Sequence, residues 1–389
     1  MSLPICCNAL SLMGTPVESV GRQSRLDPAG RSKIIGVGTA TSESSYSQED
    51  ILDIFKVEDR RIRSLFLNGS IKRRYLALPQ PDASGNRRVE TQAELLDKHK
   101  TLGMELGISA LQKSLQRAGA TVDDVRYLCC VSTTGLLTPG FSALLCDALH
   151  MRHDCGRLDV VGMGCNAGLN ALNVVANWAQ ARPGELAILL CIEACSAAYV
   201  FDGSMRTAVV NSLFGDGAAA MAVRADAEQA AAGPVIVKFA SCLIPKTLDA
   251  MRFDWDQCHG KFSFFLDRDI PYIIGANSEE VVDRLLAGTS LRRNDIAHWI
   301  VHAGGKKVID AVRINLGLTG NDLRHTSGVL QDYGNLSSSS FLFSYERLLA
   351  EKDRIRAGDY GVFMTMGPGS TIETALIHWP SAPQPPLHS

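Results

Sequence analysis

The chain contains 389 residues, with 39 Lys and Arg against 41 Asp and Glu and a formal net charge of -2 at pH 7. Because 46% of the residues are hydrophobic and 21% are charged, a large core is expected, and global disorder and a general affinity for nucleic acid or anionic membranes are excluded. At roughly 150 residues per domain, this length predicts two or three domains or one duplicated fold.

The start of the chain, residues 1–30, contains neither a basic segment nor a continuous apolar run, so we expect no signal peptide. No apolar run reaches the ~18 residues that span a bilayer. The 11 Cys are scattered without the spacing of a disulfide framework. Scattered cysteines in a chain without an export signal predict free thiols and a cytoplasmic location.

Basic residues gather in two short runs, Arg60–Arg63 and Lys72–Arg74. Such runs usually form a solvated surface. The alternative is a rim that holds the phosphates of a carrier such as coenzyme A, because guanidinium groups bind phosphate with paired hydrogen bonds. Both interpretations remain open from the residues alone.

Three pairs of segments repeat along the chain in the same order: 119–132 with 288–302, 182–191 with 356–365, and 215–223 with 367–375. The first two pairs each combine a glycine, a polar turn and an apolar run, which is typical of a strand buried on both faces. Amphipathic helical patterns at 104–115, 169–176 and 308–316 lie between them. Strands that alternate with helices predict a duplicated α/β fold whose layered sheets are mostly parallel.

The repeat divides the chain into an N-terminal half, residues 31–230, and a C-terminal half, residues 231–380. The boundary is expected in the Ala-rich stretch 225–233, which ends in Gly-Pro. Residues 1–30 are then an N-terminal extension, and residues 381–389 a proline-rich tail.

One group of residues has side chains of the kinds that bind metal ions. Cys146, His150, His153 and Cys155 have spacing that suits zinc. Cys146, however, lies inside an amphipathic helical pattern, which favours packing. We expect no metal site here.

Cys165 lies in the segment Gly162-Met-Gly-Cys-Asn-Ala-Gly168, where an apolar run meets the start of an amphipathic helix. A cysteine at a strand-to-helix turn experiences the dipole of the helix N-terminus, which favours the thiolate and lowers the pKa of the thiol. Small neighbours let a bulky substrate approach the sulfur. A nucleophile is therefore one interpretation, and a small buried core residue is the other. The glycine spacing does not match a dinucleotide fingerprint.

A cysteine nucleophile needs a partner that accepts the thiol proton or balances the charge of the thiolate. His302 ends the apolar run 299–302, at the sheet edge where sites form in open α/β sheets. Asn335 lies before a serine-rich helix start and could donate its side-chain amide to an oxyanion. A histidine satisfied at a strand terminus and a simple helix cap are the alternatives for these two residues.

Five segments together resemble the type III polyketide synthases of the chalcone synthase family, and the resemblance covers about residues 33–380. The segments are Gly-Cys165-Asn-Ala-Gly, His302-Ala-Gly-Gly, Tyr-Gly-Asn335-Leu-Ser-Ser, Leu213-Phe-Gly-Asp-Gly217 and Met366-Gly-Pro-Gly369, and Ile71-Lys-Arg-Arg-Tyr75 also matches. The resemblance implies a thiolase fold, with duplicated βα units in an αβαβα layered arrangement, and a homodimer. Chalcone-type enzymes usually carry His-Pro-Gly-Gly where this chain has Ala303, which indicates a distinct subgroup. Within the family, the segments 161–175, 193–199, 205–212 and 262–266 most closely resemble those of the bacterial 3,5-dihydroxyphenylacetyl-CoA synthases.

The resemblance also implies roles for the candidate catalytic residues. Cys165 is the nucleophile that carries the growing acyl chain. His302 pairs with the thiolate and, together with Asn335, stabilises the thioester enolate formed by decarboxylation. Phe214 and Phe264 resemble the gatekeepers between a coenzyme A tunnel and the reaction cavity.

Arg61 and Arg63 are the candidate ligands of the coenzyme A phosphates. This transfer departs from the family pattern, because two basic positions of the plant enzymes are occupied here by Ser64 and Asn68.

The implied reaction begins from malonyl-CoA as both starter and extender. Loss of CO2 supplies the carbanion for each Claisen step, so no metal and no redox cofactor is expected, and coenzyme A acts only as the substrate carrier. The tetraketide then cyclises and aromatises, with a hydratase-like protein as an expected partner, in a pathway of antibiotic biosynthesis. Four alternatives remain: a synthase that makes a pyrone, a resorcinol or a tetrahydroxynaphthalene, and a β-ketoacyl synthase of the third type.

Overall fold

The computed structural model describes residues 31–381, except residues 86, 200 and 226–232. The predicted N-terminal extension, nearly all of the predicted tail and most of the predicted boundary at 225–233 lie outside the described residues. Within the described part, no helix combines the length and the apolar character that crossing a bilayer requires.

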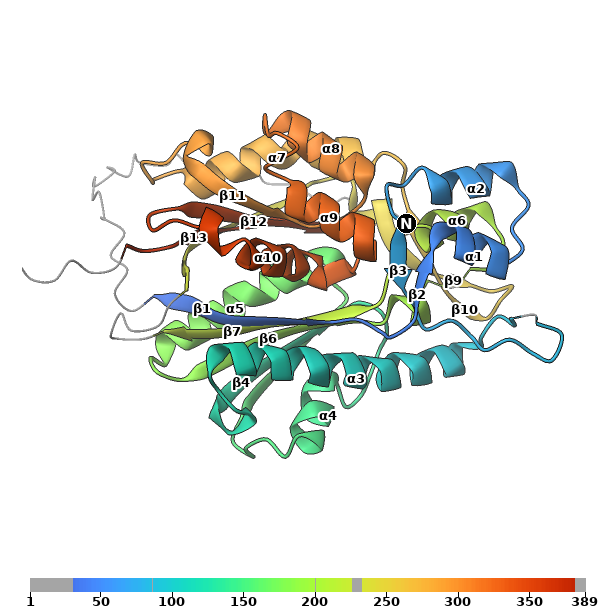
Figure 1. Cartoon of the computed structure of the whole chain (residues 1–389), viewed down its shortest axis with the longest axis horizontal. Helices are drawn as coiled ribbons and strands as arrows, with labels where there is room; N and C mark the ends of the chain where they lie inside the picture. Colours follow the sequence, from blue (N-terminus) through green and yellow to red (C-terminus); the bar gives the residue numbers. More distant parts are fainter. Residues whose placement is uncertain (1–30, 86, 200, 226–232, 382–389) are drawn as a thin grey trace, which may run out of the picture.

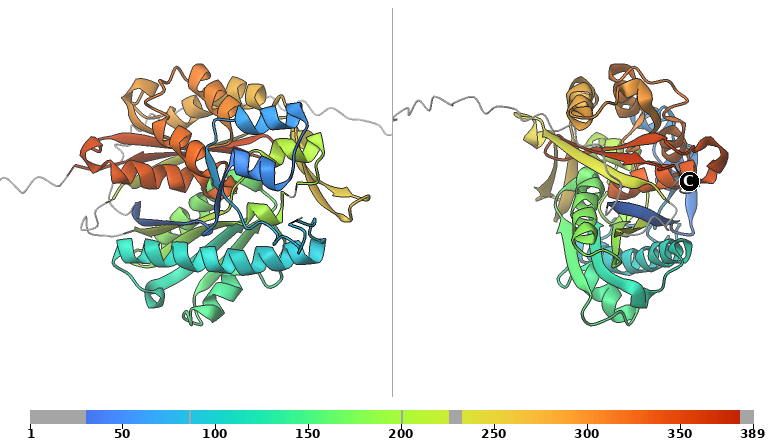
Figure 2. Two further views of the ribbon diagram at one scale, coloured as in Figure 1. Left: turned by 45° about the vertical axis from the view of Figure 1, so that its right-hand side comes forward. Right: turned by 90° about the vertical axis from the view of Figure 1, so that its left-hand side faces the viewer.

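Secondary structure is stacked in five layers, two sheets alternating with three helical layers (Figure 1). Helices α5 and α10 lie between the two sheets, and α3 and α7 cover the outer faces. Figure 2 shows the same stacking from two further sides, with α3 running along the outer face of one sheet. The predicted αβαβα arrangement is therefore confirmed.

The N-terminal half contains the first sheet, a separate two-stranded sheet of β2 and β3, and the helices packed around them. The elements are β1 (Ser32–Ala40), β2 (Ser45–Ser47), α1 (Gln48–Ile54), α2 (Arg60–Leu67), β3 (Arg73–Tyr75), α3 (Gln92–Ala118), β4 (Val125–Ser132), α4 (Phe141–Ala148), β5 (Gly156–Val161), α5 (Ala167–Ala181), β6 (Leu186–Glu193), α6 (Met205–Asn211) and β7 (Gly217–Ala225).

The C-terminal half contains the second sheet, its helices and a separate hairpin. The elements are β8 (Val235–Leu243), β9 (Met251–Asp256), β10 (Lys261–Leu266), α7 (Ile270–Leu286), β11 (Ile296–Val301), α8 (Lys306–Asn315), α9 (Arg324–Tyr333), α10 (Ser340–Ala350), β12 (Tyr360–Gly367) and β13 (Thr371–His378). At one end of the molecule, β9 and β10 form a hairpin beside α1, α2 and α6 (Figure 1).

Strand order reveals the duplication that the sequence repeats predict. The order β4-β6-β7-β1 in the first sheet corresponds to β11-β12-β13-β8 in the second, with the same strand directions. The three repeated pairs of segments overlap β4 and β11, β6 and β12, and β7 and β13, respectively. The sheets are joined by antiparallel pairing of β1 and β8 at Lys33 and Val235, so hydrogen bonding connects nine strands.

The expectation of mostly parallel sheets is wrong. Among the described strands of the nine-stranded sheet, parallel pairing is confined to β4–β5, β4–β6 and β11–β12, and the other pairs are antiparallel. A strand buried on both faces has the same apolar pattern in either direction, so the sequence pattern did not report the direction of β7, β13, β1 and β8.

Helix α3 shows how local sequence sets an element that positions the site. Its N-terminus has a capping box, in which the Thr91 hydroxyl accepts from the Glu94 N–H and the Glu94 carboxylate accepts from the Thr91 N–H at 2.9 Å. It ends at Gly119, whose φ of 63° is the left-handed conformation that glycine adopts without strain. The helix packs against β1 and β7.

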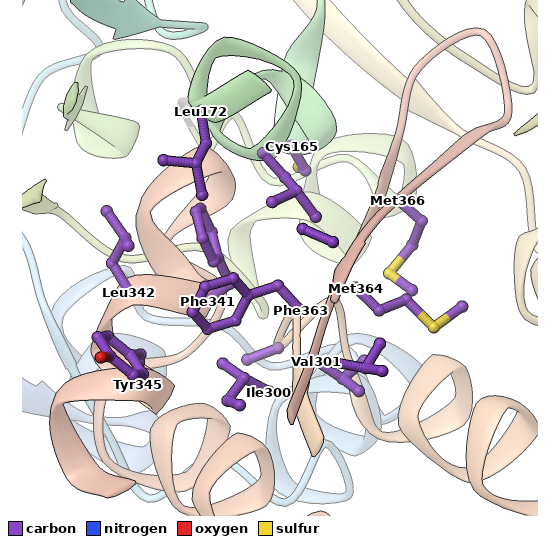
Figure 3. Packing of buried hydrophobic residues seen from close by; sticks show 14 of the residues in the cluster. Cys165, Leu172, Ile300, Val301, Phe341, Leu342, Tyr345, Phe363, Met364 and Met366 are labelled. Carbon is purple, nitrogen blue, oxygen red and sulfur yellow. The ribbon is translucent and has the colours of Figure 1, made fainter. Parts of the chain in front are cut away.

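Buried side chains from both halves meet around the two central helices (Figure 3). Leu172 of α5 and Phe341 of α10 lie in this core with Phe363 of β12, and Phe341 and Phe363 are in edge-to-face contact at 5.6 Å between ring centroids. Cys165 borders the same cluster. The core therefore fixes the position of Cys165 relative to the C-terminal half.

Replacement of Gly38 with alanine is expected to destabilise the fold. A Cβ at this position of β1 would lie 2.4 Å from the Ser114 backbone N and 2.5 Å from the Ala110 carbonyl oxygen, so α3 would have to move. We expect the free energy of unfolding to fall by about 1–3 kcal/mol or more, measured by urea unfolding. Gly320→Ala is the matched control, because nothing lies within 4 Å of a Cβ there. Equal stabilities of the two variants would contradict this packing.

Candidate active site

Cys165 lies in a short 3-10 turn, Gly164–Asn166, between β5 and α5, as the sequence predicts. The preceding Gly164 has a φ of 76°, and a Cβ there would lie 2.2 Å from the Pro368 ring. A Cβ on Gly367 would lie 2.9 Å from the Cys165 backbone N. The end of β12, in the C-terminal half, therefore packs directly against the backbone of the candidate nucleophile.

The thiol of Cys165 is buried, with 8% of the residue exposed. Burial raises the pKa of the Cys165 thiol to about 12, although a hydrogen bond with Ser337 acts in the opposite direction. The expectation that the pKa of this thiol is lowered is therefore not met, because desolvation outweighs the hydrogen bonds that stabilise the thiolate. Removing the proton from Cys165 therefore requires a nearby group that stabilises the charge.

His302 follows β11, and only 2% of the residue is exposed. Burial lowers the pKa of its imidazole to about 3, so the ring is neutral at pH 7 in this state. Its backbone is fixed by a hydrogen bond from its N–H to the Met364 carbonyl at 2.8 Å. The Nδ1 atom has no hydrogen-bond partner among the described residues.

Asn335 lies in the loop between α9 and α10, and its backbone pairs with the segment that contains Phe214. Its N–H donates to the Leu213 carbonyl at 2.8 Å, and its carbonyl accepts from the Gly215 N–H at 3.0 Å. The side-chain Oδ1 accepts from the Ser337 N–H at 2.8 Å. The amide Nδ2 has only a long contact, 3.5 Å, to the Gly304 carbonyl. Asn335 thus caps a local turn through its oxygen and keeps its amide N–H groups available.

The three candidate catalytic residues are connected by contacts with Ser337 and Gly304. Ser337 Oγ lies 3.4 Å from Cys165 Sγ, and the Ser337 N–H binds Asn335. The Asn335 amide approaches Gly304, and a Cβ on Gly304 would lie 3.3 Å from His302 Nε2. Cys165 from the N-terminal half and His302 and Asn335 from the C-terminal half therefore lie around one site.

A buried carboxylate extends this site and was missed by the sequence analysis. Glu193, at the end of β6, accepts from the Thr133 hydroxyl at 2.9 Å and from the Thr133 N–H at 3.1 Å. The Thr133 hydroxyl lies 2.9 Å from Ser337 Oγ, and Ser338 Oγ donates to the other carboxylate oxygen. Hydrogen bonds therefore run from Glu193 to Cys165. The available sequence signal was a single acid at the end of the otherwise apolar run 186–193.

Replacement of Glu193 with glutamine is expected to change how stability depends on pH. Burial raises the pKa of Glu193 from 4.5 to about 7. The folded protein therefore keeps this proton to a higher pH than the unfolded chain does. As a result, the Glu193 contribution makes the free energy of unfolding fall as the pH rises from about 4.5 to about 7, by about 3 kcal/mol.

Urea unfolding at about pH 5 and about pH 7.5 measures this difference. The Glu193→Gln protein should lack that decrease, while Glu280→Gln, a change at an exposed helical position, should retain it. A wild-type protein and a Glu193→Gln protein with the same pH dependence would show that Glu193 titrates normally.

A cavity of about 490 Å³ opens beside Cys165. Its wall includes Thr133, Tyr199, Phe253 and Phe264, and most of the lining is apolar. A dry, aromatic wall excludes water from reactive intermediates.

The two predicted gatekeepers lie close together, but only one of them lines the cavity. The rings of Phe214 and Phe264 are 6.3 Å apart at 87°. Phe264 lines the cavity, whereas Phe214 is buried behind Tyr199, which stacks on it at 4.1 Å. Tyr199 therefore lies between the two predicted gates, and the sequence analysis did not assign it to the site.

The basic residues of the two runs differ in environment. Arg61 is exposed on α2 and pairs with Asp59 at 3.4 Å, and Arg63 donates to the Val57 carbonyl at 3.1 Å. Neither lines the 490 Å³ cavity. Arg74 fits neither of the interpretations drawn from the sequence, because it is fully buried and donates to the Phe214 carbonyl at 2.8 Å. Burial lowers the pKa of Arg74 to about 9.

The four residues with zinc-like spacing do not gather into one group. Among the described residues, the ligand-type side chains that lie within 4.8 Å of one another are Asp202, Asp256 and His259. A cluster of this kind is common on protein surfaces without an ion.

A duplicated five-layer fold with a cysteine at a strand-to-helix turn of one half, and a histidine and an asparagine from the other half, defines a condensing enzyme of the thiolase fold. The N-terminal domain model of the chalcone and stilbene synthases matches residues 19–227, and the C-terminal domain model matches residues 238–380. The chain belongs to the chalcone and stilbene synthase family, and it is a type III polyketide synthase, which confirms the resemblance seen in its motifs.

Two named enzymes are similar to this chain over most of its length. The 3,5-dihydroxyphenylacetyl-CoA synthase of Streptomyces toyocaensis is 60% identical over 376 residues, which cover 95% of this chain and 96% of the relative. The enzyme of the same name from Amycolatopsis orientalis is 62% identical over 347 residues, covering 89% and 93%. Among solved structures, the polyketide synthase PKS-I of the brown alga Ectocarpus siliculosus has a TM-score of 0.83 at 24% identity, covering 90% of this chain and 98% of that one.

Proposed function

We propose that this chain condenses malonyl-CoA units on Cys165 by decarboxylative Claisen steps, then cyclises and aromatises the product to 3,5-dihydroxyphenylacetyl-CoA. The observation that carries the proposal is the identity of 60% and 62% to two enzymes of that name over nearly their whole length. The contacts through Ser337 and Gly304 that bring Cys165, His302 and Asn335 together support it independently.

The first step loads the enzyme. The Cys165 sulfur attacks the thioester carbon, its proton passes to His302, and coenzyme A leaves with a proton as the free thiol. Burial opposes an isolated charge on either residue. A thiolate and a neighbouring imidazolium stabilise each other through their opposite charges. The proton transfer from Cys165 to His302 is therefore favourable only because both ions form together.

The second step generates the carbon nucleophile. When the malonyl thioester loses CO2, the electron pair of the broken C–C bond enters the thioester as an enolate. His302 and the Asn335 amide donate hydrogen bonds to the enolate oxygen, and each such donor is worth about 3–4 kcal/mol in comparable sites. The carbanion attacks the acyl carbon, the bond from that carbon to the Cys165 sulfur breaks, and the thiolate leaves. The lengthened chain, now a thioester of coenzyme A, reloads Cys165 for the next extension. This mechanism uses neither a metal nor a redox cofactor.

The last steps take place in the cavity of about 490 Å³. An intramolecular aldol condensation closes the ring of the tetraketide, and loss of water followed by enolisation gives the aromatic product. The apolar wall protects the poly-β-keto chain from hydrolysis. Phe264 at the wall and Phe214 behind Tyr199 are the proposed gate, and Arg61 and Arg63 the proposed contacts of the coenzyme A phosphates.

The proposal also includes an oligomeric state, a location in the cell and a biological role. The family resemblance supports a homodimer that acts in the cytoplasm, in antibiotic biosynthesis. A hydratase-like partner would assist the dehydration or release the product.

Mass spectrometry of the products formed by the pure protein from malonyl-CoA alone tests the proposal. We expect a dihydroxyphenylacetyl thioester or its free acid. Pyrones or naphthols as products would agree with the proposed condensation steps but contradict the proposed product. A requirement for an acyl carrier protein would instead indicate a β-ketoacyl synthase.

A further inference from the structure

Two buried nitrogen donors lie beside the site and are used neither by the fold nor by the proposed mechanism. Lys261, the first residue of β10, is only 3% exposed, and its Nζ has no hydrogen-bond partner among the described residues. The Nδ2 of Asn211, the last residue of α6, is buried and also lacks a partner among them. Unsatisfied buried donors are rare in folded proteins and require an explanation.

Both donors line the same small cavity. Helix α6 packs against β10, and the pocket between them has a free volume of about 10 Å³, which accommodates one water-sized group such as a carboxylate oxygen. Tyr199 and Phe264 line this pocket and also the larger cavity that contains Cys165. The two donors therefore lie immediately behind the aromatic wall of the reaction cavity.

Lys261 makes no hydrogen bond with a carboxylate among the described residues, although Asp256 is its cross-strand partner in the hairpin. Asp202 is a carboxylate that the charge of Lys261 influences. The Asp202 carboxylate already accepts from the Thr207 hydroxyl at 2.5 Å and from the Ser204 N–H at 2.9 Å, and it makes no hydrogen bond to Lys261 among the described contacts. A buried ammonium without a bonded partner is costly, so this site favours an anionic acceptor.

We propose that Lys261 and Asn211 form a subsite that binds one oxygen of the free carboxylate of the malonyl thioester. The subsite rests on the proposed function, because that function makes malonyl-CoA the substrate. The ammonium supplies the charge and the amide a second hydrogen bond, which together distinguish malonyl thioesters from acyl thioesters that lack a carboxylate.

The subsite acts before decarboxylation. A cation bound to the carboxylate stabilises the reactant and would slow the loss of CO2 if it stayed in place. Cys165 lines the larger cavity but not the pocket of Lys261, so a carboxylate held in that pocket keeps the malonyl thioester away from the Cys165 sulfur until the carboxylate is released. Lys261 and Asn211 are therefore specificity-determining residues that select the substrate and then release its carboxylate into the apolar cavity.

Two inert coenzyme A thioethers test the subsite by calorimetric titration of the whole protein. Carboxyethyl-CoA has the chain length and the carboxylate of malonyl-CoA but no thioester carbonyl, so it neither loads Cys165 nor loses CO2. Propyl-CoA is the same without the charge. We expect the wild-type protein to bind carboxyethyl-CoA about tenfold more tightly than propyl-CoA.

The Lys261→Met protein should lose this preference through weaker binding of carboxyethyl-CoA alone, and Asn211→Leu should show a smaller loss in the same direction. Lys113→Met, at an exposed lysine that binds the Thr39 carbonyl, should behave as wild type. Equal affinities of the wild-type protein for both thioethers, or equal loss of both in Lys261→Met, would overturn the subsite and leave the proposed function intact. A wild-type protein that binds neither thioether would contradict both. If the preference appears but the product of malonyl-CoA is a pyrone, the subsite stands and only the product assignment fails.

Discussion

The Cys165→Ala protein is expected to form no polyketide from malonyl-CoA, a loss on the order of 10⁴-fold or more. Without the sulfur, no acyl-enzyme forms, and no other thiol among the described residues lines the 490 Å³ cavity. Loss of CO2 from malonyl-CoA should continue, because His302 and Asn335 still stabilise the enolate. Liquid chromatography with mass spectrometry should therefore detect acetyl-CoA but no cyclised product.

Cys129→Ala is the matched control for this experiment. Cys129 is a fully buried thiol of β4 that does not line the cavity, so its removal should affect stability but not the chemistry. Polyketide formed by Cys165→Ala at a rate near that of the wild type would remove Cys165 from the mechanism.

The Asn335→Asp protein is expected to lose decarboxylation and condensation by about 10²–10³-fold. The change keeps an oxygen that can accept from the Ser337 N–H, so the local turn should persist. It removes the amide N–H groups, whose long 3.5 Å contact to Gly304 leaves them free to bind the enolate. The rate of acetyl-CoA release from malonyl-CoA measures the effect directly.

Ser339→Ala is the control within the same turn, because it removes a hydrogen bond of 2.8 Å to the Leu336 carbonyl without touching the amide of Asn335. It should retain activity and lose a small amount of stability. Full activity of Asn335→Asp would show that the side-chain amide contributes only to the cap.

Much of the fold was predictable because it depends on local patterns. The repeated glycine, turn and apolar run located β4 and β11, and their shared position in each sheet follows from the duplication. Strand direction was not predictable, since Gly217–Ala225 and Thr371–His378 are buried on both faces whichever way they run. The direction is set by pairing with distant strands.

The site was predictable only where a motif carries the chemistry. The flanking glycines and serines pointed to Cys165, His302 and Asn335, which the structure brings together. They did not indicate the raised pKa of Cys165, because that shift depends on burial of the thiol in the folded chain. Glu193 and Tyr199 contribute through contacts with residues far away in the chain. Arg74 was grouped with surface charges, yet tertiary packing encloses it.

The contact of Gly367 with the backbone of Cys165 limits how chains of this family can be recombined. A chimera that takes its first half from one relative and its second half from another inherits the nucleophile from one parent and the groups that activate it from the other. Such an exchange succeeds only where the parent of the second half has a glycine at the end of β12 and a serine at position 337 that fits beside Thr133 of the other parent. Variation in product among such chimeras should therefore come from the cavity wall, while the junction between the halves stays fixed.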